Sequence, residues 1–388
     1  MSLKVLIAPD KFKGTLTARA AAEVMAAGWL SAFPDASVRM LPMSDGGDGF
    51  GELLGSLLKA TVQTIKTVDA ASRPCVAQWW WEPKTKTAVI ESAEVVGMAG
   101  LPAGRFHPFE LDTFGLGAVV KAATEMGAKK AIIGIGGSAT NDGGFGLARS
   151  VGWKFIDSNN QPLEQWIRLE ALAGIKPPHR ICWPKDLSIA VDVQNPLLGR
   201  KGATRVYGPQ KGLRAEDIDH SERCLTRLAQ VVKKDCGLGL ARVAGSGAAG
   251  GLGFGLAAFL GAKLEPGFEL FAKRAGLEER LSWADIVVTG EGSIDDSTLM
   301  GKGVGQIAAR CRELQVPCIG LAGSVTFSRR SHAFAKTYAL TDLTTDVRAK
   351  ARAAFWLERA AKRAGQEWLR DAEWLTRPAT PRDSAGAF

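Results

Sequence analysis

Cysteine pairs and long apolar runs are both missing from this sequence. Its six cysteines are scattered, with no C-x-x-C pair and no Cys/His cluster along the chain, so neither a zinc site nor a disulfide framework is predicted. No apolar run reaches the roughly eighteen residues that a membrane-spanning helix needs. The short basic start from Met1 to Lys4 leads directly into an apolar strand and lacks a signal-peptide pattern. We therefore expect a cytoplasmic protein with reduced thiols.

Signatures of nucleic-acid binding are missing as well. The net charge is +9, but no basic run is interleaved with aromatic residues, and no known DNA- or RNA-binding pattern occurs. Acidic small molecules suit this charge equally well. Part of the excess positive charge lies near the C-terminus, on positions that suit a solvated helix face. These residues are Arg348, Lys350, Arg352, Arg359, Lys362, Arg363 and Arg370. Neither a nucleic acid nor a membrane is expected as a partner.

Length and composition are those of a globular protein with more than one core. Apolar residues make up 46% of the chain and charged residues 23%, which is typical of soluble domains. A chain of 388 residues usually forms two domains.

A glycine-rich loop follows an apolar strand in the middle of the chain. Ala131 to Ile135 read as a buried strand, and Gly134 to Gly146 hold six glycines in thirteen residues. Glycine lets backbone N–H groups approach an anion closely and form a nest for phosphate. The loop also carries short polar side chains that bond well to backbone, phosphate or metal, namely Ser138, Thr140, Asn141 and Asp142. We interpret the loop as an anion cradle.

Two other interpretations of this loop stay open. The spacing of Gly134, Gly136 and Ala139 matches the dinucleotide fingerprint G-x-G-x-x-A, and Asp157 lies about where a ribose-binding acid is expected. That fingerprint needs a helix to begin inside it, whereas residues 141–144 favour a continuing loop. Glycine clusters also serve tight turns without any ligand.

Acidic and basic residues follow two N-terminal strands. Asp10, Lys11 and Lys13 come after the strand Leu3 to Ala8, where they suit a ligand or a loop ion pair. After a second strand near residues 37–41, Asp45 and Asp48 bracket two glycines. This pair suits Mg²⁺, although Asp48 alone would also serve as a helix cap.

Similar loops recur later in the chain. Asp192 leaves an apolar strand that ends at Val191, so it is a candidate base or metal ligand. Lys211 lies in the loop Y-G-P-Q-K-G. The glycine-rich residues 244–255 suit either an anion at a helix N-terminus or close helix packing. The segment 290–303 reads as a loop whose Glu291, Asp295 and Lys302 suit Mg²⁺ and phosphate, but it is not a Walker A sequence.

Strands that end in polar loops and alternate with helices predict an α/β fold. Ligands gather at the carboxyl ends of strands in such sheets, so the loops at 9–14, 44–49, 134–144, 192–196 and 290–303 are expected to meet at one cleft. Carboxylates, lysines and an anion nest, with no His/Ser/Cys triad, suit phosphoryl transfer.

Seven ordered motifs resemble those of the bacterial glycerate kinases of the glycerate 2-kinase type. They are A-P-D-K-F-K-G, L-P-M-S-D-G-G-D-G, I-I-G-I-G-G-S-A-T-N-D-G-G, D-V-Q-N-P-L, Y-G-P-Q-K-G, G-S-G-A-A-G-G-L-G and V-V-T-G-E-G-S-I-D. The resemblance implies ATP- and Mg²⁺-dependent phosphorylation of D-glycerate to 2-phosphoglycerate by a monomer or homodimer. It also implies two α/β domains: a Rossmann-like domain with a parallel sheet from residues 1–66 and 286–388, and an inserted α/β domain with a mixed sheet from residues 67–285, with the cleft between them.

The resemblance suggests a role for each candidate residue. Asp192 or Asp10 would accept the proton of the substrate hydroxyl, and Lys13 would offset negative charge. Asp45 and Lys211 would bind substrate. The candidates for holding the nucleotide phosphates are Gly136, Gly137, Ser138, Asn141, Asp142 and Lys302. Glu291 and Asp295 would hold Mg²⁺.

Several positions depart from the pattern of the resembled family. Ser293 stands where the family usually has Arg, Ser297 where it has Gln, and Val96 where it has Ser before a glycine. Leu116-Gly117-Ala118 replaces Thr-Gly-Glu, and P-L-E-Q-W-I-R-L-E, residues 162–170, replaces a glycine-rich stretch. A diverged relative with another hydroxy acid as substrate, a non-catalytic relative and an NAD-linked dehydrogenase therefore stand as alternatives.

Overall fold

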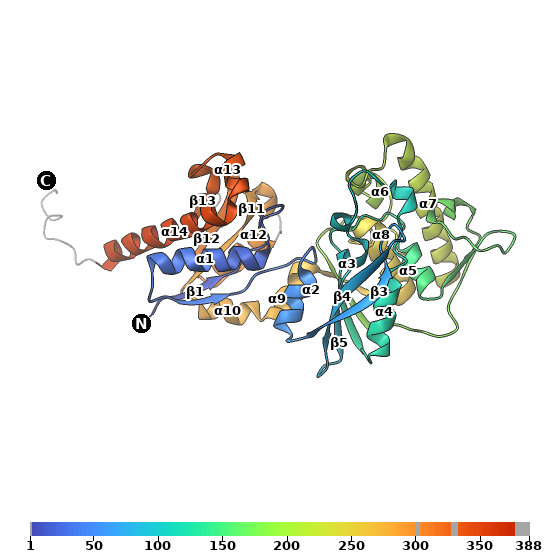
Figure 1. Ribbon diagram of the computed structural model, residues 1–388, viewed down its shortest axis with the longest axis horizontal. Coiled ribbons are helices and arrows are strands. Elements are labelled where there is room, and N and C mark those ends of the chain that lie inside the picture. Colours follow the sequence, from blue (N-terminus) through green and yellow to red (C-terminus); the bar gives the residue numbers. More distant parts are fainter. Residues whose placement is uncertain (1, 300–302, 327–332, 377–388) are drawn as a thin grey trace, which may run out of the picture. The chain divides into compact units, whose positions relative to one another are not determined.

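The chain divides into two compact units (Figure 1). The structure is a computed structural model that describes residues 2–299, 303–326 and 333–376. One unit, called the terminal unit, contains both chain ends, Met1–Met43 and Gly276–Phe388. The other, called the inserted unit, is Ser44–Ala275. In the part of the chain that the structure describes, no helix is both long and apolar enough to cross a membrane.

The boundaries of the two units differ from the sequence prediction, which placed residues 44–66 in the terminal unit and 276–285 in the inserted one. Strand β3 (Thr61–Val68) pairs along its whole length with β4 (Pro74–Glu82), and α2 (Phe50–Leu57) packs against β4. Helix α10 (Leu277–Trp283) instead packs against β1 of the terminal unit. Strand pairing and helix packing thus move both boundaries.

The sheet of the terminal unit is parallel throughout, as a Rossmann-like domain requires. Its order is β13-β12-β11-β1-β2, and in the register Val5 lies between Ile286 and Val38. The three central strands, β1, β11 and β12, contain buried apolar runs because both faces of the sheet are covered there. The strands are β1 (Lys4–Ile7), β2 (Ser37–Met40), β11 (Ile286–Asp295), β12 (Cys318–Thr326) and β13 (Lys336–Ala339).

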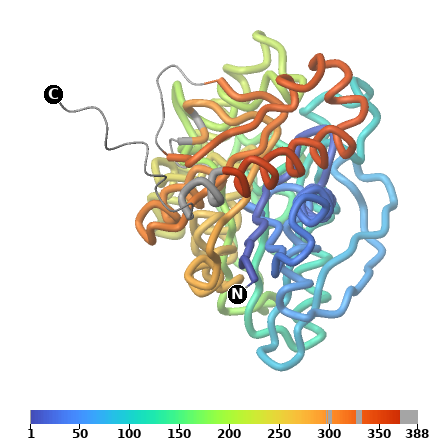
Figure 2. The backbone as a smooth tube through the Cα atoms, turned by 90° about the vertical axis from the view of Figure 1, so that its left-hand side faces the viewer, coloured from blue at the N-terminus to red at the C-terminus, as the bar shows by residue number. Residues whose placement is uncertain are grey.

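Two long helices, α1 (Ala18–Ala32) and α14 (Ala353–Thr376), pack side by side in the terminal unit (Figure 2). Thr17 caps α1, because its hydroxyl accepts a hydrogen bond from the N–H of Ala20 at 3.1 Å. Gly28 permits the close approach, since a Cβ there would lie 2.3 Å from the carbonyl oxygen of Glu358. Arg352, whose φ of −135° is not helical, separates α14 from the helix that precedes it. The other helices are α11 (Asp296–Leu299), α12 (Gly303–Glu313), α13 (Asp346–Ala351) and the 3₁₀ turn η5 (Leu340–Asp342).

The inserted unit is built on a six-stranded mixed sheet of order β10-β9-β6-β5-β4-β3. Strands β10, β9, β6 and β5 are parallel to one another, whereas β4 pairs antiparallel with both β5 and β3. This matches the predicted mixed α/β domain. The further strands are β5 (Thr87–Glu91), β6 (Lys130–Gly134), β9 (Asp186–Val191), β10 (Lys263–Pro266) and a separate hairpin of β7 (Lys154–Ile156) with β8 (Gly174–Lys176).

Helices pack on both faces of this sheet. Adjacent tryptophans on β4 are both buried, since Trp79 joins the main core and Trp80 packs against α2, where a Cβ on Gly51 would lie 2.0 Å from its ring. The helices are α3 (Ala93–Val96), α4 (Leu116–Glu125), α5 (Phe145–Ser150), α6 (Ala203–Tyr207), α7 (Ala215–Cys236), α8 (Ala248–Leu260) and α9 (Gly267–Ala275). The 3₁₀ turns are η1 (Met98–Gly100), η2 (Pro108–Glu110), η3 (Trp166–Ala171) and η4 (Pro209–Lys211).

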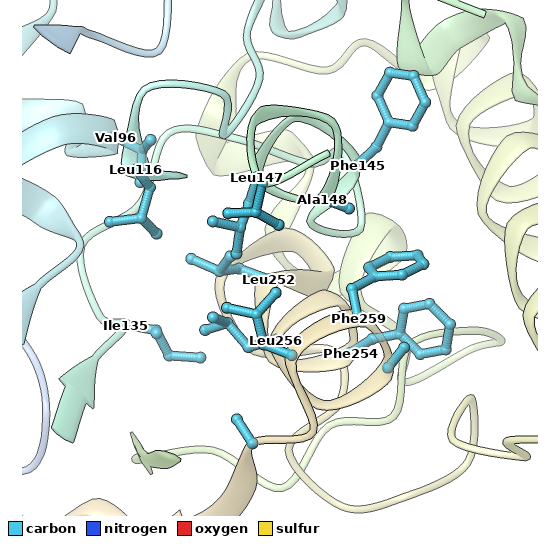
Figure 3. Close-up of a cluster of buried hydrophobic side chains, with 14 of the residues drawn as sticks. Val96, Leu116, Ile135, Phe145, Leu147, Ala148, Leu252, Phe254, Leu256 and Phe259 are labelled. Carbon is cyan, nitrogen blue, oxygen red and sulfur yellow. The ribbon is translucent and has the colours of Figure 1, made fainter. Parts of the chain in front are cut away.

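The main core lies where α5 and α8 face each other (Figure 3). Leu147 of α5 and Leu252 and Leu256 of α8 are fully buried there. Phe259 packs edge-on against Phe254 with ring centroids 6.5 Å apart. Because α5 directly follows the glycine-rich loop, this core fixes one end of the loop.

Candidate active site

The glycine-rich loop between β6 and α5 lies against a second glycine loop, residues 44–49. The N–H of Gly136 donates to the carbonyl of Gly46 at 3.0 Å. A Cβ on Gly136 would lie 2.5 Å from the Cα of Gly47, and one on Gly137 would lie 2.2 Å from a carboxylate oxygen of Asp48. These two glycines are therefore required for the approach of the loops, besides any part in binding an anion.

Asp142 points into the protein and holds the loop. Its carboxylate is fully buried and accepts four hydrogen bonds: from the N–H and hydroxyl of Thr113 at 2.9 and 2.7 Å, from the N–H of Gly146 at 2.9 Å and from that of Gly144 at 3.1 Å. Burial raises the pKa of Asp142, and these hydrogen bonds oppose the rise. Desolvation, followed by repulsion from Asp142, raises the pKa of neighbouring Asp112 to about 6.

Lys211 contacts the same loop from η4. Its ammonium donates to the hydroxyl of Ser138 at 2.9 Å and to the carbonyl of Thr140 at 2.6 Å. Desolvation lowers the pKa of Lys211 to about 7, and the charge of Asp142 opposes this. Two residues expected to have separate roles, Ser138 in binding phosphate and Lys211 in binding substrate, are thus bonded to each other.

Unmet hydrogen-bonding capacity remains beside this lysine. The side-chain amide of Asn141 donates to the hydroxyl of Thr204 at 3.1 Å. Its carbonyl oxygen and the hydroxyl of Thr140 are buried and have no hydrogen-bond partner among the described residues. Buried polar atoms are usually paired, so these two groups are suited to a polar ligand.

The loop at residues 44–49 begins α2, and Glu91 caps that helix. The N-cap residue is Gly49, with φ 86°, and no side chain of its own caps the helix. The two oxygens of Glu91 instead accept from the N–H groups of Gly49 and Gly51, each at 2.9 Å. Asp48 therefore is not the cap that the sequence allowed. Asp45 accepts from the N–H of Gly47 at 3.1 Å, which shapes the turn.

Asp192 follows β9 at the same edge of the sheet. It is exposed, although the strand that it follows is largely buried. Loop 44–49 comes close to this strand end, since a Cβ on Gly46 would lie 2.7 Å from the carbonyl oxygen of Ala190. Tyr207, whose hydroxyl donates to Asn195 at 2.6 Å, has its pKa raised by burial and by the charge of Asp192. The inserted unit therefore brings Asp192, the loop at residues 44–49 and the glycine-rich loop after β6 to the same edge of its sheet.

The remaining candidates lie in the terminal unit, at the carboxyl ends of β1 and β11. Asp10 donates its N–H to the carbonyl of Gly290 at 2.8 Å and accepts from the N–H of Lys11 at 2.7 Å. A Cβ on Gly292 would lie 3.4 Å from the backbone nitrogen of Lys13. The loop that carries Asp10 and Lys13 is therefore adjacent to the part of β11 that carries Glu291.

Thr298 joins the two predicted metal ligands. Its hydroxyl donates to Glu291 at 2.8 Å, and its N–H donates to Asp295 at 3.2 Å. Oxygen donors of this kind fit Mg²⁺. The sequence gave Thr298 no role, although a threonine beside two acids in one short segment is a usable signal.

Residues 290–295 form a strand, and their prediction as a loop was wrong. Strand β11 continues to Asp295 and pairs with β12, with Glu291 opposite Ala322 and Ser293 opposite Ser324. The hydroxyl of Ser324 lies 3.2 Å from that of Ser293. Lys302 lies outside the described residues.

Comparison with known proteins identifies the family. The model of the glycerate kinase family matches residues 5–369. The chain belongs to the glycerate kinase family. It is 39% identical over 325 residues to a glycerate kinase of Halalkalibacterium halodurans, covering 83% of this chain and 85% of that one, and 36% identical over 330 residues to the glycerate 2-kinase of Escherichia coli, covering 84% and 86%. A crystal structure from Salmonella typhimurium LT2, provisionally described as a glycerate kinase 2, matches with a TM-score of 0.81 and 32% identity over 96% of this chain and all of the other.

Family membership confirms the resemblance seen in the sequence. The structure also argues against interpreting the glycine-rich loop as a dinucleotide-binding fingerprint. No helix begins within the fingerprint, because α5 starts only at Phe145. Asp157 lies in the β7–β8 connection and accepts from the N–H groups of Asn159 and Gln161, each at 2.8 Å.

The second glycine-rich segment packs closely against the first. The N–H of Gly143 donates to the carbonyl of Gly250 at 3.0 Å. A Cβ on Gly250 would lie 1.9 Å from the carbonyl oxygen of Thr140, and one on Gly255 would lie 2.6 Å from the Cα of Gly144. Of the two interpretations of residues 244–255, this geometry favours close packing.

Proposed function

We propose that this member of the glycerate kinase family is an ATP-dependent kinase that phosphorylates D-glycerate to 2-phosphoglycerate. The observation that carries the proposal is the glycine-rich loop fixed from within by Asp142 and from the side by Lys211. A loop held in this way presents backbone N–H groups without further ordering, which is what a phosphate-binding nest requires. The prediction that all five polar loops meet at one cleft stays a prediction.

Each candidate residue takes its role from the chemistry of phosphoryl transfer, which depends on positioning and on neutralising charge. Residues 136–141 would hold nucleotide phosphates, and Lys13 would offset the charge on the carboxylate or the transferred phosphoryl group. Asp45 would bind the substrate. Glu291 and Asp295 would hold Mg²⁺, which would neutralise phosphate charge when bound. Asp192 or Asp10 would accept the proton of the attacking hydroxyl.

The exposure of Asp192 favours it over the half-buried Asp10 as the group that a substrate can reach. Asp192→Asn keeps the shape of the side chain and removes the base. We expect kcat to fall by about 10²–10⁴-fold, the usual contribution of general-base catalysis, with the melting temperature unchanged. The measurement is ADP release with glycerate as substrate. Near-normal turnover would remove Asp192 from the mechanism, and Asp10→Asn would then be tested in the same assay.

A second substrate class is favoured by Ser293. The family usually has arginine here, and Ser293 offers a short hydroxyl next to Ser324 instead of a cation. Another small hydroxy acid, with polar groups that hydrogen-bond to these two hydroxyls, would suit such a site. ADP release across a panel of hydroxy acids separates the two substrates: a higher kcat/KM for glycerate than for any other acid supports the first proposal. ADP release with none of them would contradict both.

A further inference from the structure

The segment that replaces a family glycine-rich stretch, residues 162–170, packs against α7 of the inserted unit. It folds into η3, which buries Trp166 and Leu169 in the main core. The thiol of Cys224 donates to the carbonyl of Ile167 at 3.2 Å, and the guanidinium of Arg227 donates to the carbonyl of Leu172 at 2.6 Å. This segment is thus firmly attached to α7.

The packing of η3 brings Glu170 to two metal-binding side chains of α7. His220 and Cys224 lie four residues apart on the helix, so they share one face. The sequence prediction of no Cys/His cluster missed this pair. The Nδ1 atom of His220 lies 3.3 Å from Oε1 of Glu170, and its Nε2 atom lies 3.8 Å from the Sγ of Cys224. One donor atom from each of the three residues lies within 4.8 Å of the others. A carboxylate, an imidazole and a thiol therefore meet at one point.

We propose that Glu170, His220 and Cys224 form a binding site for a thiophilic divalent cation of the Zn²⁺ type, apart from the phosphate chemistry of the glycine loop. Zinc bound to sulfur at about 2.3 Å and to nitrogen at about 2.0 Å in tetrahedral geometry holds these donors roughly 3.5 Å apart. The observed 3.8 Å separation of Sγ and Nε2 is close to that value. The rigid helix already holds both donors at the required spacing.

Glu170 supports this pair of donors from the other ring nitrogen of His220. A carboxylate that accepts the Nδ1–H of a histidine fixes the tautomer that leaves Nε2 free to bind metal. The contact between Glu170 and His220 has this form. A thiolate and a carboxylate would balance the charge of a divalent cation, with water filling the open positions.

Two groups compete with the cation. Arg223 bonds to Glu170, but its side chain is 60% exposed and can turn to solvent without leaving a cavity. Cysteine binds a metal as its thiolate, so binding to Cys224 must release the thiol proton. The affinity should therefore increase as the pH rises from 6 to 8.

The test is a titration of the full chain with Cd²⁺, followed by the ultraviolet absorbance of the cadmium–thiolate bond, and with Zn²⁺ by calorimetry. We expect one cation per chain. Cys224→Ser should remove the thiolate absorbance, and His220→Gln should weaken binding. Glu170→Gln should weaken it by about 10–100-fold, the usual effect of losing an orienting partner. Cys236→Ser is the matched control, because Cys236 lies on the same helix outside the cluster, and it should bind as the native protein does.

The outcome does not depend on kinase activity. Serine can donate the same hydrogen bond to Ile167, so Cys224→Ser should keep the fold, which circular dichroism would check. His220→Gln leaves the buried thiol in place and gives an independent result. Absence of a thiolate absorbance in the native protein, or its persistence in Cys224→Ser and loss in Cys236→Ser, would overturn the proposal.

Discussion

Asp142 and Lys211 show how single residues fix the glycine-rich loop. The sequence marked both as ligand-binding candidates because their types suit phosphate and substrate. The structure places the carboxylate of Asp142 among four donors within the fold and bonds Lys211 to the loop itself. Both residues therefore affect the ligand first through the shape of the loop.

Asp142→Asn tests this role. The amide presents a donor where the carboxylate accepted, so at least one buried N–H or hydroxyl loses its partner. The cost of such a group is about 1–3 kcal/mol, and we expect the free energy of unfolding in urea to fall by this amount. Asp157→Asn is the control, since Asp157 accepts two hydrogen bonds in a half-exposed turn. Equal stabilities for the native protein and Asp142→Asn would show that the buried carboxylate contributes nothing to the fold.

Lys211 gives a prediction about pH. Its pKa falls from 10.5 to about 7 in the folded protein, so between these pH values the unfolded chain binds a proton that the folded one does not. The free energy of unfolding should therefore gain a rising contribution from Lys211 as pH increases through this window, and lose it as pH falls towards 7. Lys211→Met should lack this contribution in urea unfolding at a series of pH values. Lys176→Met, at an exposed lysine of β8, should keep it. An identical pH slope in the native protein and Lys211→Met would contradict the lowered pKa.

At the scale of elements, two glycine loops of the inserted unit approach each other more closely than side chains would allow. Gly136 contacts Gly47 at the backbone, and residues 143–144 contact Gly250 and Gly255. The loop is thus packed between two other backbone segments, and its shape depends on all three.

Gly136→Ala should disrupt this packing. The new Cβ would lie 2.5 Å from the Cα of Gly47, so backbone must move, which typically costs about 1–3 kcal/mol. We expect a lower melting temperature and a higher KM for ATP in the ADP-release assay. Gly239→Ala is the control, because a Cβ there meets nothing within 4 Å. An unchanged KM for ATP would show that the approach of the loops is not needed for nucleotide binding.

The sequence predicted elements well where the signal is local. The apolar run before the glycine loop became β6, and α1 begins after Thr17, a residue type that is favoured at helix N-caps. Prediction from the sequence failed where a residue far away along the chain determines the local structure. Glycines and acids at 290–295 suggested a loop, but β12 pairs with them. Glu91 caps α2 from 42 residues away, a contact that no local pattern reveals. Which way Asp142 points also depends on Thr113, on another segment.

At the scale of the whole molecule, the inserted unit has its own sheet and its own core. All six strands of its mixed sheet lie within Ser44–Ala275. The main hydrophobic core, from Ala70 to Ala262, is also contained in it. The inserted unit therefore meets the requirements of an independent domain.

Residues 44–275 expressed alone should fold cooperatively. The reason is that no strand of the sheet and no residue of its main core is lost by the cut. Near-ultraviolet circular dichroism and a single sigmoidal melting curve would demonstrate this. Leu252→Ala in the same fragment, which removes a fully buried side chain, should lower its stability by about 2–5 kcal/mol. A fragment without a melting transition would show that the terminal unit is needed for folding.

The pairing of β1 has a consequence for the order of events on the ribosome. Strand β1 pairs with β2 on one side and with β11 on the other, and β11 begins only at Ile286. During translation, the first strand to emerge must wait, with one edge unpaired, until the whole inserted unit has been made. Domains fold as units while the chain grows, so the inserted unit should be complete first. The part of the protein synthesised earliest then finishes folding last, and its exposed strand edge is where nascent chains of this enzyme most need chaperones.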